Sequence, residues 1–460
     1  MSHYLPFIIS SLIGLLSLNL ILKKETGVSF LLKLFLGAGL GFALCANIVF
    51  LSLMAFHRFN KPFVITTNLL LLLILTAINL RTLRIKLSFE KKHLIDTGMI
   101  LTIGLLLIPV WQQAGYYIYG GWDAWSVWNL KAKFIFLGGH SWERIFSPLL
   151  WRSSPHYPLL LPLMNVWGWA FLKEASFLGP LLNSFIFTFL LSGLFFFGLK
   201  DLTKSNLGII PLSFMLTLHI FQASAYSQYC DLFMAYYLVA AYFTILSAKK
   251  RNSAQFALLS GIMLGILSFT KNEGLIAAIF LLALAMPFLR TNGKKLLEQS
   301  LIKSLFYGAA IGFTPTIIFS FIYAPKNITF INGLFSLTNP VSLTRIQNLV
   351  SLYSIEFFSP VVSLFRSLPS AAGNLIPGKW SLFWVVIIVV TLFGWKRLFR
   401  KDNLLYPSFL LLYGIFVTFY YFINTYFEIG WWVSVTLYRI IFSILPVFIF
   451  WFFYSLWKED

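Results

Sequence analysis

The stretch that decides the fold runs from residue 97 to residue 133 and reads TGMILTIGLLLIPVWQQAGYYIYGGWDAWSVWNLKAK. Its first part, 97–118, is almost entirely apolar, and about 20 such residues cross the hydrocarbon core of a bilayer as a helix. A glycine pair follows the apolar run, and Asp123 comes next among several tryptophans. The stretch therefore predicts a membrane-spanning helix that leads into a loop whose polar groups lie just outside the membrane.

The composition extends this prediction to the whole chain. Of its 460 residues, 59% are hydrophobic and 11% are charged, with a mean hydropathy of +0.82. Soluble domains are far less apolar, so we expect a polytopic membrane protein. The first apolar run opens at Leu5 without the basic segment and the small-residue cleavage site of a secretory signal. Cys45 lies within an apolar run and Cys230 adjoins Asp231, which makes a disulfide framework implausible.

The net charge of +20 points to topology and not to nucleic acid. Lysines and arginines occur in short clusters between apolar runs, as in the cytoplasmic loops of membrane proteins. We therefore exclude nucleic acid as a partner.

Apolar runs long enough to cross, or nearly so, predict an all-α polytopic protein with about thirteen transmembrane helices. The runs are 5–22, 29–56, 62–80, 97–118, 176–199, 207–226, 229–248, 254–270, 274–290, 301–324, 380–396, 404–424 and 434–456.

The stretch 157–172 is apolar but short and contains two prolines, so we interpret it as lying in or partly entering the membrane interface without crossing. This choice places all the main Lys- and Arg-rich loops on one side, which is cytoplasmic by the positive-inside rule. The N-terminus is then outside and the C-terminus inside. If 157–172 crossed, every basic cluster from Lys249 onward would change sides and the bias would disappear.

The chain divides into four parts on this basis. Residues 1–96 contribute three N-terminal helices, and 97–324 form a core with a large outer loop at 119–175. Residues 325–378 make a long outer segment, and 379–460 supply the last helices.

Aromatic residues surround the first outer acid. In an α-helix starting near Trp122, the rings of Trp122, Trp125 and Trp128 share one face, as in a helix that lies in the membrane plane at headgroup depth. Asp123 falls off that face, with Lys131 and Lys133 on either side of it. One carboxylate with two nearby cations suits an anionic headgroup beside a proton acceptor. Equally, Asp123 caps the helix and the two lysines are interfacial anchors.

A second outer group comes from the proline-rich segment that holds His156 and Tyr157. The prolines fix an extended backbone, so both side chains stay at the interface within reach of a phosphate or a hydroxyl. The alternative is an ordinary interfacial anchor.

Further charges open the later spans. Asp231 begins one span. It is either a second acid that orients an acceptor or binds a metal, or a helix cap. Lys271 and Glu273 flank a tight outer turn, where the lysine suits a phosphate and the pair equally suits a solvated ion pair. Arg439 lies within the last span, where a guanidinium is costly and needs a partner, and its shape suits a phosphate.

The order of these groups resembles the GT-C glycosyltransferases, especially the lipid-carrier-dependent branch with the protein O-mannosyltransferases and the aminoarabinose transferase of lipid A. The similarity extends over about 97–456. It rests on five features that occur in the same order: an acid in the first large outer loop, a His-Tyr-Pro segment, Asp231 before an aromatic span, the Thr-Lys-Asn-Glu-Gly turn at 270–274, and Arg439.

The resemblance implies a GT-C-like fold and roles for these residues. The catalytic base of the family matches Asp123, and the acid of the next outer turn matches Asp231. The family's turn lysine matches Lys271, and its late phosphate-binding cation matches Arg439. We include Lys131, Lys133, His156, Tyr157 and Glu273 among the substrate-binding candidates.

Two departures bear on this resemblance. The family commonly has Glu after the first acid, whereas Ala124 follows here, and three helices precede the core. No cofactor is specified, and a divalent cation stays open.

The expected reaction is transfer of a sugar, with inversion, from a polyprenyl-phosphate donor to a hydroxyl of a glycan, lipid or protein. It would occur at the outer face of the bacterial inner membrane, in contact with membrane lipid. One alternative is an O-antigen ligase or polymerase, which would use cations such as Arg345 and Arg366 in the long outer segment. The other is a secondary transporter, which would place its charges near the middle of the bilayer.

Overall fold

The computed structural model describes residues 2–80, 91–290, 295–326, 343–365, 380, 383–423 and 428–457. Within these ranges the chain is helical and contains no strand. The first helices are α1 (Leu5–Ile21), α2 (Phe30–Phe56), α3 (Lys61–Leu80), α4 (Lys91–Leu106) and α5 (Ile108–Tyr116). The loop region that follows holds a π-helical turn η1 (Ala124–Trp128), α6 (Asn129–Leu137), the 3-10 turns η2 (Gly139–Phe146) and η3 (Pro148–Ser153), and α7 (Leu160–Trp169).

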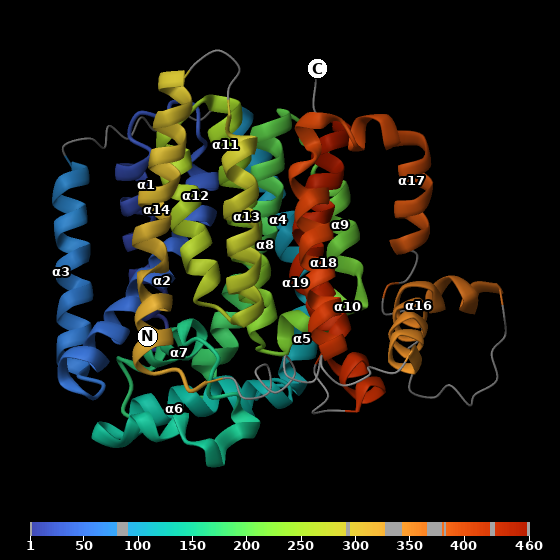
Figure 1. Ribbon diagram of the computed structural model, residues 1–460. Helices are drawn as coiled ribbons and strands as arrows, with labels where there is room; N and C mark the ends of the chain where they lie inside the picture. The colour runs from blue at the N-terminus through green and yellow to red at the C-terminus, as the bar shows by residue number, and fades with distance from the viewer. Residues whose placement is uncertain are drawn as a thin grey trace.

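The remaining helices complete the bundle. They are α8 (Leu178–Thr203), α9 (Ile209–Thr217), α10 (His219–Tyr226), α11 (Cys230–Arg251), α12 (Ala254–Ser268), α13 (Asn272–Phe288), α14 (Lys295–Ile322), α16 (Leu343–Phe365), α17 (Phe383–Leu398), the 3-10 turn η6 (Lys401–Asn403), α18 (Leu405–Ile423) and α19 (Ile429–Trp457). In Figure 1, α6 and α7 lie at the end of the bundle away from the C-terminus, and α16 and α17 lie on the flank opposite α3.

Every apolar run predicted to be a span is helical, and the chain is a multi-pass helical membrane protein. In the described ranges eight helices are long and apolar enough to cross a membrane. A ninth would be the pair α9 and α10, which bends by 73° where Leu218 adopts an extended backbone. Three more apolar helices, α1, α12 and α13, have only 15 to 17 residues. The count of thirteen crossings is thus not established, because helix formation alone does not make a helix long enough to span.

The buried centre of the bundle is α11. Every residue in its most apolar window is buried, and it packs against α8, α12, α13 and α19. Its tyrosines also reach the N-terminal helices, since Tyr236 Oη donates to the carbonyl of Phe35 at 2.7 Å and Tyr237 Oη to that of Gly39 at 2.8 Å. A buried phenol needs such a partner. The N-terminal helices are therefore packed into the same core as the later ones.

The segment 157–172 differs from its prediction in one respect. It forms α7, whose ten residues are too few to cross a bilayer, as expected. All ten are buried, however, against α1, α2, α6 and α8, so the helix is part of the protein interior and does not lie on the surface at the interface. Trp167 anchors it by donating from Nε1 to Ser10 Oγ at 2.8 Å.

Glycines let two helix pairs approach closely, α1 with α2 and α12 with α14. A Cβ on Gly261 would lie 2.2 Å from the carbonyl oxygen of Leu305, and one on Gly308 would lie 1.9 Å from that of Leu258. Backbone contact of this kind between α12 and α14 is how helices associate in lipid, where no hydrophobic effect drives them together.

We expect Gly308→Ala to destabilise the protein by about 1–3 kcal/mol, because the added methyl group forces α12 and α14 apart. Gly98 on α4 is the matched control, since nothing lies within 4 Å of an added Cβ. Gly98→Ala should be neutral or slightly stabilising, because alanine favours a helix by about 1 kcal/mol over glycine. Apparent melting temperatures in detergent would test this, and equal values for the two variants would contradict the close-packing argument.

Candidate active site

Four charged side chains from distant parts of the chain meet at the α6 and α7 end of the bundle. Asp231 lies in the first turn of α11, Lys271 immediately precedes α13, and Glu273 lies in the first turn of α13. Arg439 comes from within α19. Helix N-termini favour carboxylates, which suits both Asp231 and Glu273. The meeting of these groups creates a charged cluster where the rest of the core is apolar.

Asp231 is the centre of this cluster. Its carboxylate accepts from Lys271 Nζ at 2.8 Å, from Arg439 Nη2 at 2.9 Å and Nε at 3.1 Å, and from Ser443 Oγ at 3.2 Å. The side chain is only 3% exposed. A buried carboxylate is stable only when paired and fully hydrogen-bonded, and this one meets both conditions. Asp231 therefore fixes both cations in place.

The guanidinium of Arg439 joins a second carboxylate to the first. Its Nη1 lies 2.7 Å from Asp123 Oδ2, while its other side holds Asp231. The guanidinium carbon also lies 4.3 Å from the centre of the Tyr229 ring, a cation–π contact. The side chain of Asp123 is 27% exposed and that of Glu273 is 24% exposed, so the accessible edge of the cluster lies at these two carboxylates.

The loop that carries Asp123 is held on the turn between α10 and α11 by contacts that require glycine. Gly120 has a φ of +71°, and the amide of Gly121 donates to the carbonyl of Ser227 at 2.9 Å. A Cβ on Gly121 would lie 2.3 Å from Tyr229 Oη. Gln228 adds a further contact between the loop and the turn, because its Nε2 donates to the carbonyl of Ile118 at 2.9 Å. The glycine pair therefore sets the position of the acid that follows it.

A chain of buried amides fixes α6 against the bundle. Asn183 Nδ2 donates to Asn165 Oδ1 at 2.7 Å, and Asn165 Nδ2 donates to Asn129 Oδ1 at 2.8 Å. Asn129 Nδ2 then reaches Gln228 Oε1 at 3.4 Å. The chain links α8, α7 and α6 to the same turn that holds the Asp123 loop.

The structure distinguishes between the two interpretations of Asp123. Although Asp123 precedes the first turn of η1, its side chain makes no capping hydrogen bond and is paired with Arg439. The predicted stripe of three tryptophans is wrong. Trp122 and Trp125 are exposed with their rings 4.4 Å apart, whereas Trp128 is buried and stacks on Tyr157. The cause is the π-helical turn, whose wider winding breaks the α-helical spacing.

The two lysines of α6 do not join the cluster, contrary to the arrangement predicted around Asp123. Lys133 is exposed. Lys131 is fully buried and donates from Nζ to the carbonyls of Ser154 at 2.7 Å and Tyr157 at 3.2 Å. Neither forms an ion pair within the part of the chain that the structure describes. The predicted directions of the Lys131 and Lys133 side chains are wrong for the same reason as the predicted tryptophan stripe. The π-helical turn shifts the angular positions of the residues that follow it.

His156 and Tyr157 lie beside the cluster, as the sequence indicated. Tyr157 Oη donates to Glu273 Oε1 at 3.3 Å, and the His156 ring lies edge-on to the Tyr157 ring at 5.0 Å. Burial, and then the nearby charge of Lys131, lower the pKa of His156 to about 4, so it is neutral at pH 7. Burial and the neighbouring carboxylate of Glu273 raise the pKa of Tyr157 well above its usual range.

Glu273 has one engaged and one free carboxylate oxygen. Oε1 lies 3.4 Å from Lys271 Nζ and accepts from Tyr157, whereas Oε2 is buried without a hydrogen-bond partner among the described atoms. Burial by itself would lower the pKa of Lys271, but Asp231 and Glu273 outweigh it and raise that pKa above its ordinary value. Lys271 is thus a permanent cation with two carboxylate neighbours.

The environment of Lys131 makes a pH-dependent prediction. Burial lowers its pKa from 10.5 to about 7. A lysine with a depressed pKa penalises the folded state fully below about pH 7, and the penalty disappears as the pH rises towards 10.5.

We therefore expect the melting temperature of the wild type to rise relative to that of Lys131→Met between pH 7 and pH 10. The difference between the two proteins isolates Lys131 from other titrating groups. Parallel curves over this range would mean that Lys131 stays charged throughout.

Two residues of the cluster were missed from the sequence. Ser443 lies one turn after Arg439 on the same face of α19 and donates to the same carboxylate, so its i+4 spacing was an available signal. Tyr229, which stacks on Arg439, adjoins Asp231 but looks like any interfacial tyrosine in the sequence.

The predicted alternative sites are only partly described. Arg345 lies on α16 and donates to the carbonyl of Tyr421 at 3.0 Å, while Arg366 lies outside the described residues. Of the long outer segment 325–378, the structure describes 325–326 and α16. For a divalent cation, no group of three or more His, Cys, Asp or Glu side chains is placed to hold a metal in the described part of the chain. Asp231 is already saturated by its cations, so its surroundings do not fit a metal.

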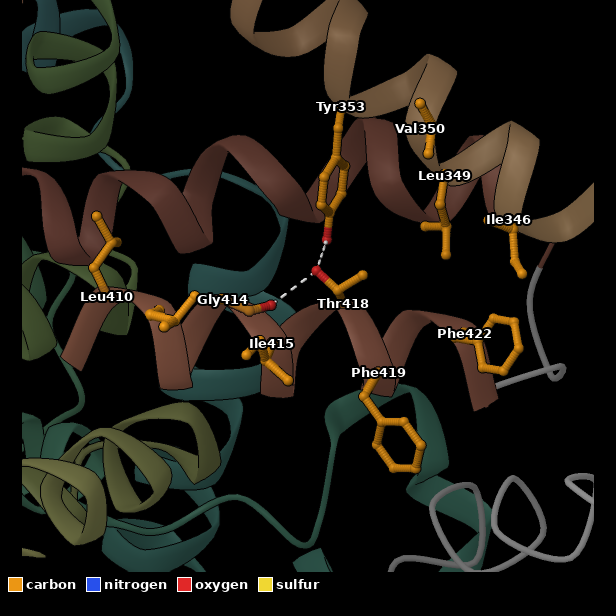
Figure 2. Close-up of a pocket in the computed structure, with 11 residues that line it drawn as sticks. Ile346, Leu349, Val350, Tyr353, Leu410, Gly414, Ile415, Thr418, Phe419 and Phe422 are labelled. Carbon is orange, nitrogen blue, oxygen red and sulfur yellow. Dashed lines mark hydrogen bonds between the residues drawn. The ribbon is translucent and has the colours of Figure 1, made fainter. Parts of the chain in front are cut away.

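An apolar groove lies between α16 and α18. Its volume is about 610 Å³, and Figure 2 shows Tyr353 of α16 meeting Thr418 of α18, with other lining residues carried by both helices. Tyr353 Oη and Thr418 Oγ1, 3.1 Å apart, are its main polar pair. α18 also packs against α13, the helix that begins with the cluster residues. The helix α18, which lines the groove, is therefore a direct neighbour of α13, which begins at the cluster.

Comparison of the chain with protein-family models, with curated proteins and with solved structures found no match.

Proposed function

We propose that the protein is an inverting glycosyltransferase that moves a sugar from a polyprenyl-phosphate donor to a hydroxyl acceptor. The observation that carries the proposal is one buried guanidinium shared by two carboxylates, one buried and one accessible. This arrangement supplies, side by side, a proton acceptor and a cation fixed for a phosphate. Both are needed to transfer a group from a phosphate ester to a hydroxyl.

In the proposed reaction the residues divide the work. Asp123 accepts the proton of the attacking hydroxyl, whose oxygen forms the new bond to the anomeric carbon on the face opposite the phosphate. The bond from that carbon to the phosphate oxygen breaks, and its electron pair stays on the phosphate. Lys271 and Arg439 stabilise the growing negative charge. Asp231 keeps both cations in place and does not itself touch the reacting atoms.

The groove between α16 and α18 supports a lipid-linked donor. A polyprenyl chain is apolar and long, and aliphatic residues line the groove on both sides. Lipid carriers keep an activated sugar at a membrane surface where nucleotide sugars are absent. The acceptor would be a glycan, lipid or protein.

We propose the outer face of the bacterial inner membrane as the place of reaction, with the N-terminus outside and the C-terminus inside. Support comes from the two ends of α11. Asp231 opens the helix, whereas Lys249, Lys250 and Arg251 close it. The basic end would face the cytoplasm by the positive-inside rule, and the cluster would then lie on the outer side.

The test is label transfer by the purified protein in liposomes supplied with radiolabelled polyprenyl-phosphate sugars and membrane acceptors. We expect label in an acceptor fraction only when the protein is present. A folded protein that transfers no monosaccharide from any such donor, yet joins a lipid-linked oligosaccharide to an acceptor, would instead indicate a ligase or polymerase. Uptake of a solute without any transfer would indicate a transporter.

A further inference from the structure

The charge balance of the cluster raises a question about phosphate binding. Asp123, Asp231 and Glu273 are three carboxylates, whereas Lys271 and Arg439 are the two cations that contact them. Both cations are therefore already paired in the ligand-free protein. Among the residues of the cluster that the structure describes, a phosphate finds no unpaired cation, so it has to replace one of the carboxylates.

We propose that the carboxylate of Asp123 occupies the phosphate-binding position at Arg439 Nη1 and leaves when the phosphate of a prenyl phosphate ester binds. This inference rests on the proposed function, because it names how the donor phosphate is recognised at the same site. It also assigns Asp123 a second role, as an internal substitute for the ligand in the resting protein.

The contacts decide which carboxylate is replaced. Asp231 is 3% exposed and accepts from Lys271, Arg439 and Ser443, so displacing it would leave buried charges unpaired. Asp123 is 27% exposed, belongs to a loop, and its carboxylate has Arg439 as its one hydrogen-bonding partner among the described residues. Partly exposed ion pairs contribute little to stability. Asp123 is therefore the weaker competitor.

Arg439 is built to keep its position during the exchange. Nε and Nη2 stay on Asp231, and the ring of Tyr229 covers one face of the guanidinium. Only Nη1 changes its partner. The donor phosphate is a diester whose two non-bridging oxygens share one negative charge, and the monoester that the reaction releases carries more charge still, so both compete with the Asp123 oxygen for this N–H donor.

The exchange would couple donor binding to the availability of the base. In the ligand-free protein Arg439 Nη1 occupies the Asp123 carboxylate at 2.7 Å, and a phosphate that takes Nη1 leaves that carboxylate open to the acceptor hydroxyl. The base would then be released only when a donor is in place. The proton of the acceptor hydroxyl passes to Asp123, and the electron pair of the broken bond passes to the phosphate that Arg439 now holds.

The experiment measures the affinity of purified protein in detergent for farnesyl phosphate, a short form of the prenyl phosphate monoester that the reaction releases, by calorimetry. Asp123→Ala removes the competing carboxylate and should bind about tenfold more tightly than wild type, because the binding-competent state no longer has to be opened. Asp123→Asn, which keeps the shape of the side chain, should change affinity in the same direction by a smaller factor. Glu298→Gln is the control: it removes one negative charge that pairs with the exposed Arg290 outside the cluster, so we expect a change of no more than about threefold.

Each outcome has a distinct meaning. Equal or weaker binding by both Asp123 variants overturns the exchange, while farnesyl phosphate binding by wild type keeps the proposed function. An equal gain in Glu298→Gln also overturns the exchange, since it indicates a general effect of charge. No binding of farnesyl phosphate by any of these folded proteins overturns the proposed function as well. Inorganic phosphate or phosphatidic acid binding as tightly as farnesyl phosphate would retain the exchange and overturn its assignment to a prenyl donor.

Discussion

Replacing Asp231 with alanine is expected to destabilise the protein by about 3–5 kcal/mol, because two buried cations lose the carboxylate they share. Lys271 and Arg439 both donate to Asp231, and the Lys271 side chain is 5% exposed and that of Arg439 15%. Water cannot readily replace the lost oxygens. The measurement is the melting temperature of the purified protein in detergent, followed by loss of its helical signal.

The control for this prediction is Glu298→Gln, which breaks an ion pair beyond the far end of α13. Glu298 lies 3.6 Å from Arg290, whose side chain is 71% exposed. Such pairs contribute about 0–1 kcal/mol. If Asp231→Ala melts no lower than Glu298→Gln, the cluster is well solvated and Asp231 is not its organising group.

The helical framework was predictable because its signal is local. A run of apolar residues near the length of a bilayer must be helical to satisfy its own backbone, whatever lies elsewhere in the chain. The last run was predicted at 434–456, and α19 extends from Ile429 to Trp457, so even its ends differ by only a few residues. The burial of α7 inside the protein could not be predicted from its own stretch of sequence. Its burial depends on α1, α2 and α8, which enclose it from distant parts of the sequence.

The cluster could be predicted only in part. The cost of a guanidinium inside a span indicated that Arg439 needs a partner, and that expectation is confirmed. Which partner it finds is a property of the fold, since Asp231 is 208 residues away in the sequence. The predicted position of Lys131 beside Asp123 is wrong for a different reason. Its direction was inferred from α-helical geometry, and the π-helical turn before it has a different angular spacing.

Removing the proposed base gives the largest expected effect on activity. We expect Asp123→Asn to lower the rate of sugar transfer by about 10²–10⁴-fold, the usual contribution of general base catalysis. Its melting temperature should stay close to that of wild type, because Asp123 is partly exposed and Arg439 keeps Asp231. The measurement is single-turnover transfer of radiolabel from a polyprenyl-phosphate sugar, with Glu298→Gln as a variant that should transfer at the wild-type rate.

The same variant separates the two roles assigned to Asp123. If the carboxylate both accepts the proton and competes with phosphate, Asp123→Asn should turn over slowly while it binds the donor more tightly than wild type. A slow variant with unchanged donor affinity would leave only the base. If instead Asp123→Asn transfers sugar at the wild-type rate, the proton acceptor is another group. Glu273 is then the one to replace, because its Oε2 is the carboxylate oxygen in the cluster that is buried without a hydrogen-bond partner among the described atoms, and a bound hydroxyl would supply one.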